Sequence, residues 1–197
     1  MKRARTVQTN VTLTPLHHKL MVHFENACEG LSNSQEEITK ILQIREQVLK
    51  GPGEAKLLNP SATLPQKVIV TKGTFHVVQK SVGSGTFSTA YFTVAIPFSG
   101  DVPMNRVVKC SKNSYRPEIK LLDGLSPASK LSRTIDHFIA SFFDKGKKLH
   151  FAVFEPSDCD FTKVDYTIHS APVFFMCRQL LDVANGIGSF HRRDIIL

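Results

Sequence analysis

The spacing of apolar residues changes near residue 67, and this change limits the possible folds more than any other feature of the sequence. Before it, apolar residues recur at every third or fourth position, which is typical of one face of a helix. After it, short segments rich in β-branched and aromatic residues are separated by Gly, Ser and Pro. A helical part followed by a strand-rich part predicts the α+β class.

The first part has start signals for two helices. Thr14 followed by Pro15 predicts an N-cap and the first turn of one helix. Ser34 with Glu37 three residues later predicts a capping box that opens a second helix. Because Gly and Pro follow the second apolar stripe, we expect a helical hairpin and then a linker over residues 51–66.

The second part contains five segments that we predict to be strands. They are Val68–Val70, Thr74–Val78, Tyr91–Ile96, Arg106–Cys110 and Leu149–Phe154. Glycine, serine and proline turns separate the first four, so we expect an antiparallel meander. We also expect a short helix near residues 118–122 and an apolar, buried helix over residues 171–190.

Composition excludes several classes of protein. No apolar run approaches the roughly 18 residues of a membrane span, so we expect a soluble intracellular protein, cytoplasmic or nuclear, without a membrane partner. The four cysteines lack C-x-x-C spacing, which predicts reduced, buried thiols and neither a zinc site nor a disulfide framework. The charge of +8 is spread along the chain, which predicts weak attraction to acidic partners and to phosphates, but no specific nucleic-acid partner.

A glycine-rich stretch lies between two predicted strands. It reads Val82, Gly83, Ser84, Gly85, Thr86, Phe87. Glycines let a hairpin backbone approach phosphates closely, although two glycines alone also fit an ordinary turn. Lys109 ends an apolar strand 26 residues after Gly83 (109 − 83), where its ammonium would reach the phosphates of a nucleotide.

In combination, these residues resemble the nucleotide-binding half of a eukaryotic-type Ser/Thr protein kinase, over about residues 74–196. The resemblance implies ATP and Mg²⁺ as ligands, with Lys109 paired to Glu118. It implies that nucleotide contacts come from Val82, Gly83, Ser84, Gly85, Thr86, Phe87, Ala90, Val107, Lys109, Phe154, Glu155 and Ser157.

Some positions depart from the family pattern. Ser88 stands where the third glycine is expected, and Ala90 where a valine usually covers adenine. Lys109 and Glu118 are only nine residues apart (118 − 109), which is short for the family, so a solvated Glu118 is the alternative.

The C-terminal residues resemble the end of the first long helix of the second kinase lobe. We favour an alignment in which Ile195 and Ile196 precede the catalytic loop and Leu197 takes the place of its histidine. The general base and the magnesium ligands would then be missing, and phosphoryl transfer with them. In the alternative alignment Asp194 is the base.

The expected fold is therefore a five-stranded antiparallel kinase small lobe with one helix, the first helix of the C-terminal lobe, and an N-terminal helical hairpin. We expect a tail, hairpin and linker over 1–66, the small lobe over 67–155, and a hinge with an incomplete second lobe over 156–197. Three hypotheses of function follow: a truncated ATP-dependent protein kinase, a pseudokinase that binds a protein partner through the hairpin or the C-terminal helix, and a fragment without an independent role.

Overall fold

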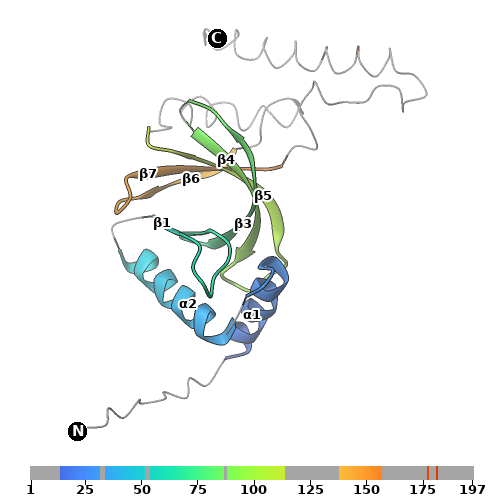
Figure 1. Ribbon diagram of the computed structural model, residues 1–197, viewed down its shortest axis with the longest axis vertical. Helices are drawn as coiled ribbons and strands as arrows, with labels where there is room; N and C mark the ends of the chain where they lie inside the picture. Colours follow the sequence, from blue (N-terminus) through green and yellow to red (C-terminus); the bar gives the residue numbers. More distant parts are fainter. Residues whose placement is uncertain are drawn as a thin grey trace.

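The computed structural model describes residues 14–31, 34–51, 54–86, 88–113 and 138–156, together with Cys177 and Leu181. These residues contain two main helices and seven strands (Figure 1). The helices are α1 (Pro15–Ala27) and α2 (Ser34–Lys50). The strands are β1 (Ala55–Leu58), β2 (Val68–Thr71), β3 (Thr74–Ser84), β4 (Ser88–Pro97), β5 (Met104–Ser111), β6 (Phe138–Asp144) and β7 (Leu149–Phe154).

Helix α1 begins as the sequence predicts, and α2 begins at Ser34, where the predicted capping box stays a prediction. The Thr14 hydroxyl accepts a hydrogen bond from the His17 backbone at 3.3 Å, and His17 Nδ1 accepts one from the Thr14 backbone at 3.2 Å. The buried Glu37 of α2 accepts hydrogen bonds from Lys40 and Thr63, which ties α2 to the segment after β1. The expected helical hairpin is confirmed.

All neighbouring strands are antiparallel, in the order β1-β2-β3-β4-β5-β7-β6. Strands β2 to β5 follow their order in the chain, so the predicted meander is confirmed for them. Strand β7 lies between β5 and β6, out of chain order. This insertion places β7 directly beside the strand that carries Lys109.

The first and last strands of the sheet approach each other. The Glu54 backbone donates to the Phe143 carbonyl at 3.0 Å. The buried carboxylate of Asp144 accepts from the Leu57 backbone at 2.9 Å and from the Lys147 backbone at 3.1 Å. These contacts curl the sheet into a nearly closed, barrel-like form (Figure 1).

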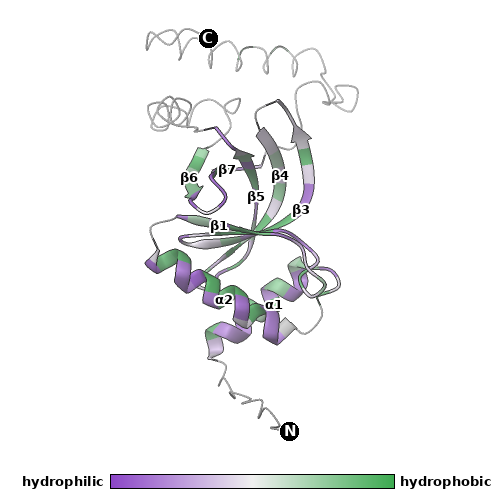
Figure 2. Ribbon diagram, turned by 60° about the vertical axis from the view of Figure 1, so that its left-hand side comes forward, coloured by the Kyte–Doolittle hydropathy of each residue, from purple (hydrophilic) through white to green (hydrophobic). Residues whose placement is uncertain are grey.

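Two apolar clusters stabilise the fold. Outside the curled sheet, Leu20 and Phe24 of α1 and Ile41 of α2 pack on buried residues that include Phe75 and Ile96. Figure 2 shows hydrophobic stretches on both helices and on the strands above them. Inside the curled sheet, a second cluster brings together strands from both ends of the sheet order. Its buried members are Ala55, Ile69, Val78, Val108, Phe151 and Val153.

The expected five-stranded kinase small lobe with one helix is wrong, because the sheet has seven strands and two helices cover one end of it. Strand β1 lies within residues 51–66, which we expected to be a linker, and strand β6 was not predicted. Each adds its backbone groups to an edge that five strands would leave unpaired. The five predicted segments lie within β2, β3, β4, β5 and β7.

Several expectations concern residues outside the described ranges. These are the helix near 118–122, the proposed end of the chain at 190–197, and most of the helix over 171–190. Within the last, Cys177 and Leu181 are helical but exposed, which is at odds with a buried helix at those two positions. Cys28 is buried and Cys110 partly buried. None of the described helices combines the length and apolar character of a membrane-spanning segment.

Candidate functional site

The glycine-rich stretch forms the hairpin between β3 and β4, as predicted. Gly85 donates its N–H to the Ser88 carbonyl at 2.8 Å, and the Ser84 and Thr89 hydroxyls lie 3.2 Å apart. Val82 sits at an irregularity in the strand pairing and is 58% exposed. The hairpin is therefore a solvent-exposed loop whose closing hydrogen bond occupies the Gly85 N–H.

A row of directly paired residues runs from this hairpin across the sheet. Gly83 pairs with Ala90, Ala90 with Lys109, and Lys109 with Ala152. Directly paired residues in antiparallel strands place their side chains on the same face. The row therefore sets Lys109 between two alanines, on the face that carries the glycine hairpin.

The face around this row is apolar. Two residues along β5 from Lys109, Val107 pairs with Phe92 and Phe154, and the period of two puts all three on the face of Lys109. Phe154 is 2% exposed and forms a third, small apolar cluster with Ala152, against which Val107 and Phe138 pack. Ala90 is partly exposed and Ala152 is 1% exposed, so the accessible part of this face lies on the Ala90 side of the lysine.

The Lys109 ammonium contacts a ring on the neighbouring strand. Its Nζ lies 4.5 Å from the centroid of the Phe154 ring, over the ring face. Such a cation–π contact contributes about 0.5–1 kcal/mol at exposed sites and more where water is excluded. The structure thus brings together Gly83, Ala90, Val107, Lys109 and Phe154 of the predicted site.

Other predicted site residues are placed differently. Ser84, Gly85 and Thr86 lie at the hairpin tip, while Glu155 follows β7 and is exposed. Phe87, Glu118 and Ser157 lie outside the described residues, so the predicted pair of Lys109 with Glu118 stays a prediction.

Sequence reasoning missed the part played by Ala152. Its place beside Lys109 depends on β7 pairing with β5, although almost 40 residues separate the two strands in the chain (149 − 111 = 38). A small residue in the middle of an apolar strand, as in Leu149–Phe154, is the one signal that the sequence offers.

Cys110 is adjacent to Lys109 in sequence but serves the opposite face. It packs with the apolar cluster inside the curled sheet, and burial raises the pKa of its thiol. A raised pKa keeps the sulfur protonated and poorly nucleophilic. Cys110 therefore belongs to the core, and Lys109 is the cation in the row that runs from the glycine hairpin.

A hollow of about 280 Å³ lies away from this face, between α1 and the turn after β4. It is lined by His18, Lys19, Val22, His23, Gly100 and Val102. Its lining is almost entirely apolar, and His23 Nε2 is engaged with the Gly100 carbonyl at 3.3 Å. Since few polar groups converge there, we place the candidate site on the Lys109 face instead.

Within the described ranges, no cluster of three or more His, Cys, Asp or Glu side chains is arranged to hold a metal ion. No protein-family model matches the sequence, and no curated protein matches it either. The functional interpretation of the Lys109 face therefore rests on its own geometry, and membership of the protein kinase family stays a prediction.

Proposed function

We propose that this chain binds a purine nucleoside triphosphate, ATP by preference, on the Lys109 face, as a member of the protein kinase superfamily would. The observation that carries the proposal is the row from Gly83 through Ala90 and Lys109 to Ala152. It sets one ammonium and one glycine hairpin on a common face, beside an apolar floor. Because ATP is an intracellular ligand, the proposal includes an intracellular location.

The glycines of the hairpin have no evident role in the fold. A Cβ at Gly83 would meet nothing within 4 Å, and one at Gly85 would touch only the Ser88 carbonyl at 3.9 Å. Neither glycine has the positive φ that side chains avoid. With crowding and positive φ excluded, glycine at these positions is explained by a ligand that approaches the backbone closely. A phosphate chain needs such an approach.

Lys109 is suited to hold phosphates rather than to support the core. The alanines on either side give its stem room, and the Phe154 ring holds the ammonium over the face of the sheet. A lysine ammonium is a compact point charge that binds phosphate oxygens well. The adenine would lie on the floor formed by Ala90 and Val107.

In kinases, magnesium ions neutralise the charge that develops on the phosphates and align them for transfer. The residues that would hold Mg²⁺ are not among those of the candidate site, so we propose binding and assign no transfer step to it. The interaction-only function stays the alternative within the same family.

The test is a thermal shift with ATP and Mg²⁺ on the full chain. At a ligand concentration one hundred times Kd, binding stabilises by about 2.7 kcal/mol, which corresponds to a Tm rise of roughly 5–10 °C for a chain of this size. Lys109→Met should remove most of that rise. Gly83→Ala should leave the ligand-free Tm within a degree or two and still weaken binding.

Lys80 offers a matched control. Its Nζ lies 5.7 Å from the centroid of the Phe92 ring, so it makes the same kind of contact on a neighbouring strand. Lys80→Met should keep the full shift. The proposal is overturned if millimolar ATP produces no shift, or if Lys80→Met and Lys109→Met lose it equally.

A further inference from the structure

One end of the curled sheet carries a concentration of positive charge. The β3–β4 hairpin, the end of β5 and the β6–β7 turn meet there, because Ser111 pairs with both Ser88 and His150. The described residues within 79–90, 108–113 and 141–151 include six lysines and one acidic residue. Four exposed lysines form what we call the basic rim. They are Lys112, Lys145, Lys147 and Lys148.

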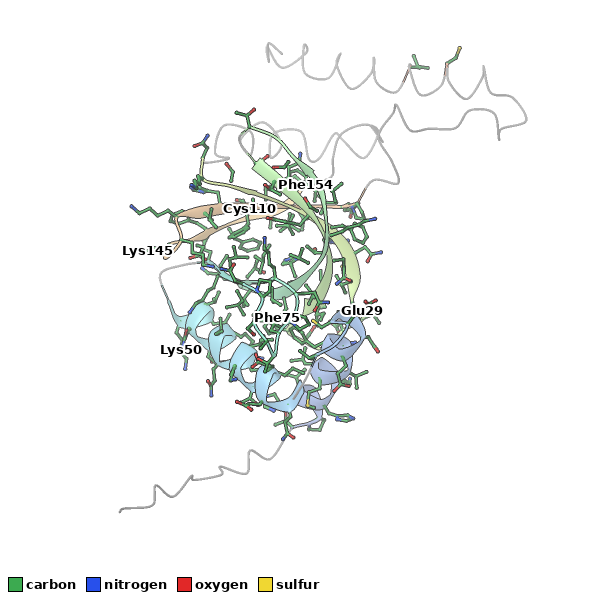
Figure 3. All side chains as sticks on the ribbon, viewed as in Figure 1. Glu29, Lys50, Phe75, Cys110, Lys145 and Phe154 are labelled. Atoms are coloured by element: carbon green, nitrogen blue, oxygen red, sulfur yellow. The ribbon has the colours of Figure 1, made fainter. Side chains whose placement is uncertain are left out.

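Two acidic side chains lie at or beside this end. Glu54, whose backbone donates to the Phe143 carbonyl, is exposed but forms an ion pair with Lys72 at 3.8 Å, and Asp144 does not face solvent. Asp144 is 4% exposed, and its two oxygens accept hydrogen bonds from the Leu57 and Lys147 backbones. It therefore fixes the turn from beneath, while the lysine side chains project outward. Figure 3 labels Lys145 at this turn, on the outer edge of the molecule.

Lys148 occupies a backbone position that favours glycine. Its φ is +53°, the one positive φ at a non-glycine residue in the described chain. A side chain in this region of conformational space carries strain, which glycine or asparagine would reduce. A lysine at this position adds charge to the rim at a cost in conformational energy, so the turn geometry alone does not account for it.

We propose that the basic rim is a docking surface for an acidic segment of a partner protein, rich in Asp and Glu. The lysines lie on a turn and a strand end that the paired strands position. A run of carboxylates on an extended segment carries the opposite charge and can contact several of these lysines at once. The proposal goes beyond nucleotide binding, since the rim lies at the end of the sheet and Lys109 lies on its face.

A nucleic acid fits this surface less well. Readers of single strands combine basic grooves with exposed aromatic rings or arginines on which bases stack. The described residues of this end contain no arginine and no exposed aromatic side chain. Lysines alone are point charges, which pair with carboxylates without needing stacking.

The test measures binding of a fluorescein-labelled peptide of alternating Glu and Ser by anisotropy, with the full chain. The triple variant Lys112→Gln, Lys145→Gln, Lys147→Gln should raise Kd about tenfold. The matched control replaces three exposed lysines of helices α1 and α2, Lys19→Gln, Lys40→Gln and Lys50→Gln, and should change Kd less than about twofold. Carbodiimide cross-links from the peptide should map to the rim.

Lys148→Gly separates binding from folding. It removes a charge and relieves left-handed backbone strain that outweighs the entropy glycine adds to the unfolded chain, so it should weaken peptide binding while raising Tm. Equal losses in the triple variant and its control would show general charge attraction and overturn the proposal. It is also overturned if a single-stranded oligonucleotide binds more tightly than the peptide and loses affinity in the triple variant, or if Lys148→Gly raises Tm with no effect on binding.

Discussion

The burial of His76 predicts that the protein loses stability in mild acid. His76 lies on β3, is 3% exposed, and pairs with Ile69 and Ala95. Its Nδ1 has no hydrogen-bond partner. Burial lowers the pKa of the imidazole from 6.5 to about 4, and the positive charge of Arg106 adds to this effect.

The direction of the pH dependence of stability follows from proton binding. Below pH 6.5 the unfolded chain protonates this histidine and the folded protein does not, so the free energy of unfolding falls as pH falls toward 4. The pKa difference of 2.5 (6.5 − 4), at about 1.36 kcal/mol per unit, gives a loss of about 3 kcal/mol. A loss of that size is a large fraction of the 5–15 kcal/mol typical of a domain.

Urea denaturation followed by circular dichroism, at several pH values from 7.5 to 4, measures this loss. His76→Leu introduces a side chain that does not titrate, so its unfolding free energy should depend less on pH, by about 3 kcal/mol across the range. His18→Gln, at an exposed histidine, should keep the pH dependence of the wild type. If His76→Leu and the wild type show the same pH dependence, the reasoning is refuted.

Two further predictions concern the closure of the sheet and the seating of α1. Asp144→Ala leaves two backbone N–H groups without their acceptor and should cost roughly 2–4 kcal/mol, whereas Asp101→Ala, at an exposed turn, should cost less than about 0.5 kcal/mol in the same denaturation assay. Gly100→Ala combines a positive φ with a Cβ 2.9 Å from Leu16 Cδ1, the movable end of a side chain, and should cost roughly 1–3 kcal/mol. Gly30→Ala has only the positive φ, so a cost of about 1–2 kcal/mol is expected. Gly73→Ala has neither feature and should be close to neutral. Equal losses of stability in the three glycine variants would contradict this reasoning.

The strands that sequence reasoning found are those with a strong local signal. Val68–Val70 and Tyr91–Ile96 are rich in β-branched and aromatic residues and end at turn residues, and both lie within strands. Strand β1 reads Ala-Lys-Leu-Leu and carries no β-branched residue, so only its partners make it a strand. Strand β6 had a usable signal, since Phe138–Asp144 is followed by a short glycine-containing turn and a predicted strand.

The architecture and the site differ in how far local sequence determines them. The five-stranded prediction failed because β1 carries little local signal and the signal of β6 was missed. The closure of the sheet depends on contacts such as Glu54 with Phe143, which no local pattern records. The glycine hairpin and Lys109 lie on adjacent strands of a meander, and their common face follows from the period of two and the short connections. The site's floor, in contrast, needed the out-of-order pairing of β7 with β5, which fixes Phe154 beneath the ammonium. Ala152→Leu, which adds bulk beside Lys109 without adding a charge, should therefore weaken ATP binding in the thermal-shift assay even with the hairpin and the lysine intact.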